Sequence, residues 1–215
     1  MIDPNVDTED SAAAGQSSAS LDGRKAWRER NQLAVVDALL DLYAEGNLRP
    51  DANTVAERSA VSRRSVFRYF NDRDDLDRTA IARQQDRVRH LLEIPAIGEG
   101  PLDERIARIA GQRVTLFDKV QWAARVSRLR APFHAIIAGE LRQSRRFLAR
   151  QVERHFAPEF AALSEPERGE TLAAADALAS FEAFDLMTSR GLGSANVRAA
   201  VERGLTALFG CGKTG

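Results

Sequence analysis

The stretch DANTVAERSAVSRRSVFRYF (51–70) contains two short helical patterns separated by only three residues, AVS. Asp51 is a plausible N-cap for a helix over about Ala52–Ser59, and Ser62 for a second helix that runs to Phe70. Two helices this short bury little surface by themselves, so a turn of fixed geometry has to hold them against other helices. This arrangement is the helix-turn-helix, in which the second helix can lie in the major groove of DNA.

The second helix has two different faces. Val66 and Phe70 are four residues apart and are predicted to face inward together with Val55, while Arg63 and Arg64 project outward. Phe67 or Arg68 extends this outer face beside Ser65. An arginine fork matches the O6/N7 pair of guanine, which makes the outer face a candidate for reading bases. Taken alone, a row of arginines is more often a solvated helix face.

The rest of the chain also reads as helical, because no run of alternating β-branched residues is present, and the predicted fold class is all-α. Residues 1–23 read as a disordered acidic tail, 24–73 as a helix-turn-helix DNA-binding domain, and 74–215 as a second helical domain. Further helices are expected at about 25–45, from the caps in NDRDDL to 94, and at 102–119, 121–130, 133–157, 165–190 and from Ser194 onward.

Composition limits the function classes. The net charge is zero, so any attraction to DNA must be local, and residues 58–73 carry five arginines against one acid, Asp72. The single cysteine, Cys211, cannot form an internal disulfide, and no Cys/His cluster has zinc spacing. No apolar run approaches the length of a membrane span, and a cytoplasmic location is expected. No catalytic constellation is evident, so neither an enzyme nor a cofactor is predicted.

Residues 54–76, TVAERSAVSRRSVFRYFNDRDDL, resemble the TetR-type transcriptional regulators. The family pattern runs roughly I-A-x-x-A-G-V-S-x-x-x-L-Y-x-H/Y-F-x-x-K-x-x-L. The matching positions are Val55, Ala56, Val61, Ser62, Val66, Tyr69, Phe70 and Leu76. The departures are Ala60 for the turn glycine, Phe67 for a tyrosine, Arg73 for a lysine and Asp51 for a threonine. The resemblance covers about residues 27–80, and the remainder agrees in architecture alone.

The resemblance implies a near-palindromic operator on double-stranded DNA. The implied base-reading residues are Arg63, Arg64, Ser65 and Phe67, and the implied backbone contacts are Asn53, Ser62, Arg68, Tyr69 and Arg73. A basic group at the start of the first helix could add phosphate or minor-groove contacts; it consists of Arg24, Lys25, Arg28 and Arg30.

The C-terminal domain is expected to bind an unknown small-molecule effector between its helices. Candidate lining residues are Phe117, Trp122, Phe133, His134, Phe147, Phe181, Phe184 and Met187, although any one of them can equally be core. A homodimer is expected through the last two helices, whose stripes could also be buried within one chain. A second arginine group on the helix at 133–157 reads as a solvated face.

The sequence therefore predicts a homodimeric regulator, by default a repressor, that an effector releases from its operator. A helical interaction or ligand-binding protein with a vestigial helix-turn-helix is the alternative, and the acidic tail, Asp51 and Phe67 favour it mildly.

Overall fold

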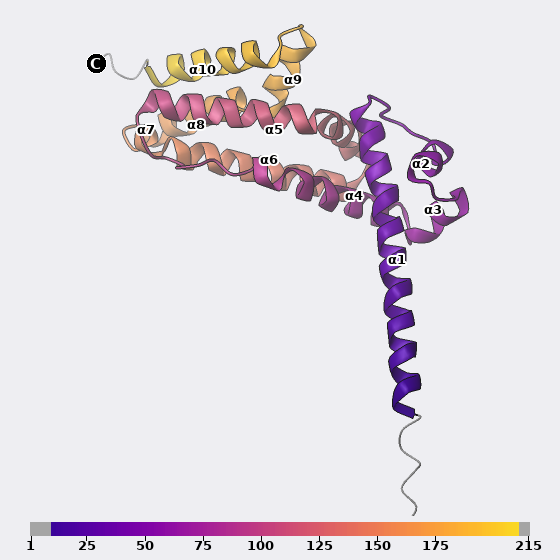
Figure 1. Ribbon diagram of the computed structural model, residues 1–215. Coiled ribbons are helices and arrows are strands. Elements are labelled where there is room, and N and C mark those ends of the chain that lie inside the picture. Colours follow the sequence, from indigo (N-terminus) through magenta and orange to yellow (C-terminus); the bar gives the residue numbers. More distant parts are fainter. Residues whose placement is uncertain (1–9, 211–215) are drawn as a thin grey trace, which may run out of the picture. The chain divides into compact units, whose positions relative to one another are not determined.

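The computed structural model describes residues 10–210, and their side chains from residue 23 onward except that of Arg73. All regular secondary structure in this range is helical (Figure 1), which confirms the all-α prediction. The chain divides into two compact units, residues 1–83 and 84–215. No helix among the described residues is long and apolar enough to cross a membrane.

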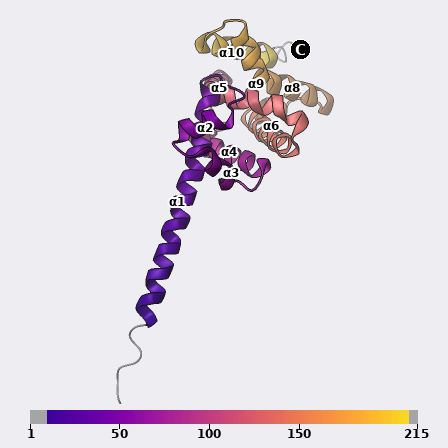
Figure 2. The same cartoon turned by 90° about the vertical axis from the view of Figure 1, so that its right-hand side faces the viewer.

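The first unit contains α1 (Asp10–Ala44), α2 (Ala52–Ser59), α3 (Arg63–Tyr69) and most of α4 (Arg73–Val88). Both α2 and α3 lie beside the C-terminal half of α1 (Figures 1 and 2), and they contact each other as well as α1. The buried side of α1 is a continuous apolar stretch that includes Val35, Val36, Leu39 and Tyr43.

The described residues of the second unit form two 3-10 turns and six α-helices in addition to the end of α4. Its elements are η1 (Arg89–Leu91), α5 (Leu102–Arg130), η2 (Ala131–Phe133), α6 (Ala135–His155), α7 (Ala157–Phe160), α8 (Glu165–Leu178), α9 (Phe181–Ser189) and α10 (Ser194–Gly210). Helix α5 lies between α10 and α6 (Figure 1) and contacts both. The core is therefore organised around α5.

Several boundaries differ from the sequence prediction. Helix α1 begins at Asp10 and not near Lys25, so residues 10–23 are helical where a disordered tail was expected. This segment is rich in alanine and contains no proline, and alanine has the highest helix propensity. Residues 1–9 of the predicted tail lie outside the described residues. The first compact unit also extends to Arg83, ten residues beyond the predicted domain boundary.

The second unit shows two further differences. Residues 102–130 form one helix instead of two, because no residue between them breaks the hydrogen-bonding pattern. Residues 165–190 form two helices instead of one. Ser180 ends the run by capping α9, since its side chain accepts a hydrogen bond from the Ala183 N–H at 3.1 Å.

The apolar stripe of α10 is buried within the chain. Val197, Val201, Leu205 and Phe209 are all in the core, and Leu208 packs against it. At Gly204 a Cβ atom would lie 3.0 Å from Leu178 Cδ2, so the missing side chain permits the close approach of α10 to α8. Internal burial thus accounts for this stripe, which the sequence left open between core and dimer interface.

His155, the last residue of α6, is a buried polar residue in the core of the second unit. The His155 ring is fully buried; its Nδ1 accepts from the Gly98 N–H at 3.1 Å and its Nε2 donates to the Arg105 carbonyl at 2.8 Å. These bonds require the neutral imidazole. Burial is the main cause that lowers the pKa of His155 below 6.5, and nearby arginines lower it further.

We expect the free energy of unfolding to fall as the pH drops below 6.5, because the unfolded chain then binds a proton that folded His155 excludes. The loss can reach about 1.4 kcal/mol per pH unit for one group. Urea unfolding followed by circular dichroism between about pH 7 and pH 5 measures it. His155→Gln should flatten the decrease, while His90→Gln, at an exposed position, should not. An equal slope in wild type and His155→Gln would contradict the assignment.

Candidate nucleic-acid interface

Both helices of the motif are capped as the sequence predicts. The Asp51 carboxylate accepts from the Thr54 N–H at 2.8 Å and from the Thr54 hydroxyl at 3.0 Å. These hydrogen bonds lower the pKa of Asp51, so the carboxylate stays charged. At the start of α3 the Ser62 hydroxyl oxygen accepts from the Ser65 N–H at 3.2 Å. The two caps fix where α2 and α3 begin.

The turn between the helices contains a left-handed residue. Ala60 has φ 55° and ψ 29°, and the Val61 N–H donates to the Ala56 carbonyl at 3.1 Å, which closes α2 with a Schellman-type end. A glycine adopts this conformation without the steric cost that a Cβ imposes. The turn glycine of the resembled family is therefore replaced by a residue that takes the same backbone conformation.

The inner face of α3 holds the helix in place. Val66, Tyr69 and Phe70 are buried, as are Val55 and Ala56 on α2. The Tyr69 ring meets the Trp27 ring of α1 edge-on, with centroids 6.5 Å apart. Because only 3% of Tyr69 is exposed, its side chain packs inside the unit; the sequence had assigned it to the DNA backbone.

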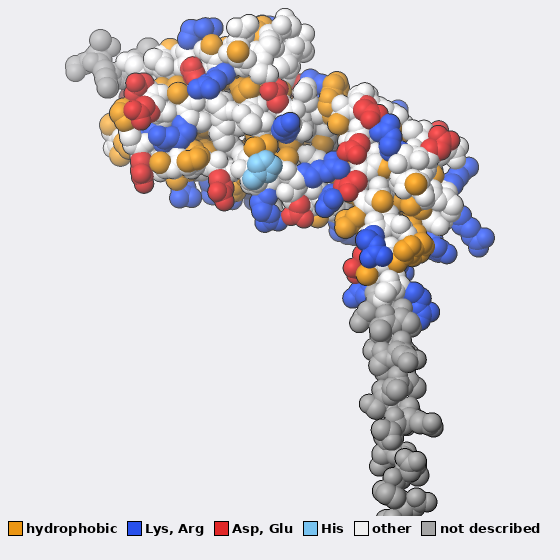
Figure 3. Space-filling model, viewed as in Figure 1, with side chains coloured by type: hydrophobic (Ala, Val, Ile, Leu, Met, Phe, Trp, Pro, Cys, Tyr) orange, Lys and Arg blue, Asp and Glu red, His pale blue; other side chains and the backbone are white. Residues whose placement is uncertain are grey.

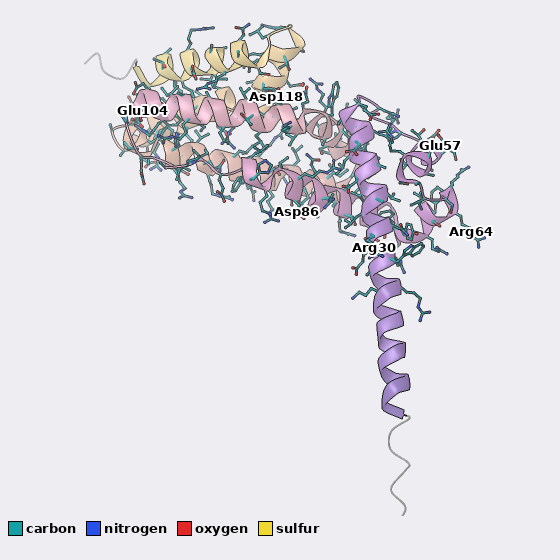
Figure 4. All side chains as sticks on the ribbon, viewed as in Figure 1. Arg30, Glu57, Arg64, Asp86, Glu104 and Asp118 are labelled. Atoms are coloured by element: carbon teal, nitrogen blue, oxygen red, sulfur yellow. The ribbon has the colours of Figure 1, made fainter. Side chains whose placement is uncertain are left out.

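The outer face of α3 is basic and carries an exposed aromatic ring. Arg63, Arg64 and Arg68 are exposed, and Phe67 is 65% exposed. Arg64 extends away from the helix in Figure 4, and Figure 3 shows Lys and Arg side chains projecting around this part of the unit. A large exposed apolar side chain within a charged patch is typical of an interaction surface. Ser65 is half-buried, and its hydroxyl accepts from the Ser62 hydroxyl at 3.0 Å.

The other predicted backbone contacts are exposed or not described. Asn53 on α2 and Ser62 are exposed, and the Arg73 side chain lies outside the described part. The basic group on α1 is also exposed; it consists of Arg24, Lys25, Arg28 and Arg30.

Two ion pairs hold the first unit together, and in each of them an arginine has a structural role. Arg58 donates to Glu45 at 2.6 and 2.8 Å, which joins α2 to the end of α1. Arg83 on α4 donates to Asp37 on α1 at 2.7 and 2.8 Å. Arg58 therefore holds the scaffold, although it belongs to the arginine-rich stretch.

The predicted effector residues are only partly brought together in the second unit. Phe117, Phe181 and Phe184 form a ring cluster with centroids 5.6 to 6.0 Å apart, and Met187 packs against it. The other predicted residues do not belong to this core cluster: Trp122 stacks with Arg125, Phe133 is 82% exposed, His134 is half-buried and Phe147 is exposed.

Arg113, which is not among the residues predicted from the sequence, has a side chain buried one turn before Phe117 on α5. The signal was available, because Ile106, Ala110, Arg113 and Phe117 recur at spacings of four, three and four. This is the period of a core-facing helix stripe, in which a charged residue is unusual.

Comparison with known proteins adds evidence on the fold. No protein-family model matches the chain. No curated protein matches it either. The chain is similar to a crystal structure of a transcriptional regulator from Rhodococcus sp. Rha1, with a TM-score of 0.64 and 17% sequence identity, over 86% of this chain and 96% of that chain. The two proteins share a fold.

We expect Ala60→Gly to raise the free energy of unfolding of the first unit by roughly 0.5–1 kcal/mol. Glycine relieves the left-handed strain, and the greater freedom of the unfolded chain offsets part of that gain. Chemical denaturation of the full chain measures the change. Ala195→Gly, at an exposed position in the first turn of α10, is the control and should be neutral or destabilising. A destabilised Ala60→Gly would show that the turn gains stability from the alanine side chain.

Proposed function

We propose that the chain is a sequence-specific DNA-binding transcriptional regulator of the TetR type. One observation carries the proposal: α3, the second helix of a capped helix-turn-helix, packs through Val66, Tyr69 and Phe70 and leaves Arg63, Arg64, Phe67 and Arg68 exposed. The similar structure from Rhodococcus, which is described as a transcriptional regulator, supports the same reading.

The exposed face of α3 offers the chemistry that base reading needs. The guanidinium groups of Arg63 and Arg64 can each make two hydrogen bonds to a guanine edge. The Phe67 ring can contact a thymine methyl group, which a tyrosine hydroxyl would not do. Arg68, Asn53 and Ser62 are exposed around this face and suit phosphate contacts, which set the register on the duplex.

Binding as a homodimer follows from the small size of one motif. Two copies of α3, about 34–36 Å apart, would occupy successive major grooves of a near-palindromic operator. The stripe of α10 is used inside the chain, but α8 exposes Gly169, Ala173 and Ala177 at spacings of four. Small side chains in such a row let a second helix approach closely, so we place the dimer contact on this side of α8.

Regulation by a small molecule is the function we assign to the second unit. An effector bound among its helices would release the dimer from DNA only to the extent that it binds the non-DNA-binding spacing more tightly. Repression is the default output, since a dimer on an operator blocks other proteins from the same DNA. The protein is expected to work in the cytoplasm.

Arg63→Ala and Arg64→Ala should each weaken operator binding roughly 5- to 150-fold, corresponding to about 1–3 kcal/mol per bidentate contact. Binding to random DNA should fall less, because that affinity comes from many phosphate contacts. Fluorescence anisotropy on an operator selected from a random library measures both. Arg190→Ala removes an exposed arginine from the second unit and should leave both affinities unchanged. Equal losses on operator and random DNA would refute base reading, and failure to select any sequence would refute the proposed function.

Ala173→Arg should convert the dimer to a monomer and weaken operator binding at least tenfold, since a monomer makes half the contacts. Light scattering after size-exclusion chromatography gives the mass. Ala162→Arg is a matched control at an exposed site outside α8. A dimeric Ala173→Arg protein would move the interface away from this side of α8.

A further inference from the structure

The second unit buries two arginines, and they are satisfied very differently. Arg105 is held by a carboxylate: Nη1 and Nη2 donate to Glu159 at 2.6 and 2.5 Å. Its Nε donates to the Gly100 carbonyl at 3.1 Å, and Nη1 also donates to the His155 carbonyl at 2.8 Å. This is how the fold stabilises a buried guanidinium that has a structural role.

Arg113 is 1% exposed and makes hydrogen bonds only to neutral groups. Its Nη1 donates to the side-chain oxygens of Gln112 and Gln151 at 2.6 and 2.9 Å, and its Nη2 donates to the Leu148 carbonyl at 3.1 Å. The Nε–H has no hydrogen-bond partner. A buried donor without a partner is costly and calls for an explanation such as a missing ligand.

The groups around Arg113 are fixed in place. The Gln112 amide nitrogen donates to the Leu91 carbonyl at 2.5 Å, and the Gln151 amide nitrogen donates to the Leu92 carbonyl at 2.6 Å. Both side-chain oxygens are thereby turned toward Arg113. The guanidinium is held by Nη1 in one orientation, so the direction of the unused Nε–H is fixed.

The charge of Arg113 is only partly balanced. Asp176 is the acid that interacts with it electrostatically, and no hydrogen bond joins the two. Burial raises the pKa of Asp176, with Glu182 adding to the rise and Arg113 opposing it. For Arg113, whose charged form is the cation, burial instead lowers the pKa to about 10. A cation in this position gains from an anion that can approach Nε.

The open edge of Arg113 has the geometry of a carboxylate site. On the first unit, Arg83 uses its Nε and Nη2 edge to bind both oxygens of Asp37, at 2.7 and 2.8 Å. On Arg113 the same edge is occupied by a single carbonyl on Nη2. A carboxylate could bind Nε and share or replace the Leu148 contact on Nη2.

Phe117 lies one turn after Arg113 on α5 and packs with Phe181 and Phe184. We propose that Arg113 binds the carboxylate of an amphipathic monocarboxylic acid whose apolar body lies against Phe117, Phe181 and Phe184. This deepens the proposed function by naming the chemical class of the effector, and its regulatory consequence rests on that function. Because Arg113 is buried, binding requires the helices around it to open.

The test compares carboxylates with their neutral amides. The probes are benzoate, phenylacetate, octanoate and decanoate, each paired with its primary amide, and the readouts are the Tm of the full chain and calorimetric titration. At least one acid should bind saturably and raise the Tm, while its amide binds at least tenfold more weakly, because the amide lacks the charge. Failure of every acid to bind, or equal binding of an acid and its amide, would overturn the proposal.

Three variants separate ligand binding from a structural role. Arg113→Met should abolish the Tm increase by the acid but leave the ligand-free Tm unchanged or higher, because a partly uncompensated charge is removed. Arg113→Lys keeps the charge without the fork and should bind with intermediate affinity. Arg105→Met, the matched control, should lower the ligand-free Tm because Glu159 loses its partner. An equal fall in Arg113→Met would make Arg113 structural and overturn the proposal.

DNA binding is measured separately on the selected operator. If the acid binds and the protein has no operator, the carboxylate site stands and the regulator proposal fails. If the protein binds its operator but neither binds nor responds to any acid, the regulator proposal stands and the carboxylate site fails. Release from the operator by the acid, and its loss in Arg113→Met, would support both.

Discussion

The burial of Val66, Tyr69 and Phe70 on one side of α3 is the contact on which the proposed function depends. A helix of seven residues is not stable alone. The unfavourable free energy of helix nucleation is greater than the stabilisation from the few hydrogen bonds that so short a segment forms. Its position comes from packing on α1 and α2 and from the caps at Asp51 and Ser62. The same packing leaves Arg63, Arg64 and Phe67 no place inside, so the geometry that stabilises α3 also presents its outer face.

The arginines of this chain show that position decides role. Arg58, Arg83 and Arg105 hold elements together by donating to carboxylates at 2.5 to 2.8 Å. Arg63 and Arg64 are exposed on α3, where the proposed function assigns them to DNA. Arg113 is buried like Arg105 but has only neutral hydrogen-bond partners. The difference lies in whether a carboxylate accepts hydrogen bonds from the guanidinium, and a buried arginine without such an acceptor is the place to look for a ligand.

The candidate site of the first unit differs in kind from that of the second. In the first, the site is a surface whose side chains need only be exposed and correctly aimed. In the second, it is a buried cation within a polar group made by Gln112, Gln151 and Leu148, next to a ring cluster around Phe117. Under the proposed function, opening of these helices on effector binding would release DNA only if the open state binds DNA less tightly than the closed state.

The sequence by itself determined the features that depend on neighbours along the chain. Helix type, the bounds of α2 and α3, the caps at Asp51 and Ser62, and the inward face of Val66 and Phe70 follow from local hydrogen bonding and helical period. The sequence also places Ala60 where the resembled family has its turn glycine, and Ala60 has a positive φ. These properties need no knowledge of distant segments.

The tertiary structure alone decided what depends on contacts between distant segments. It buried Tyr69 against Trp27, used Arg58 for the scaffold, and directed the α10 stripe into the core. It also showed that no carboxylate is hydrogen-bonded to Arg113, whereas Glu159 is hydrogen-bonded to Arg105. A helical stripe indicates which side of a helix is buried. It does not indicate which side chains contact that side, because contacts between residues that are dozens of positions apart depend on tertiary packing.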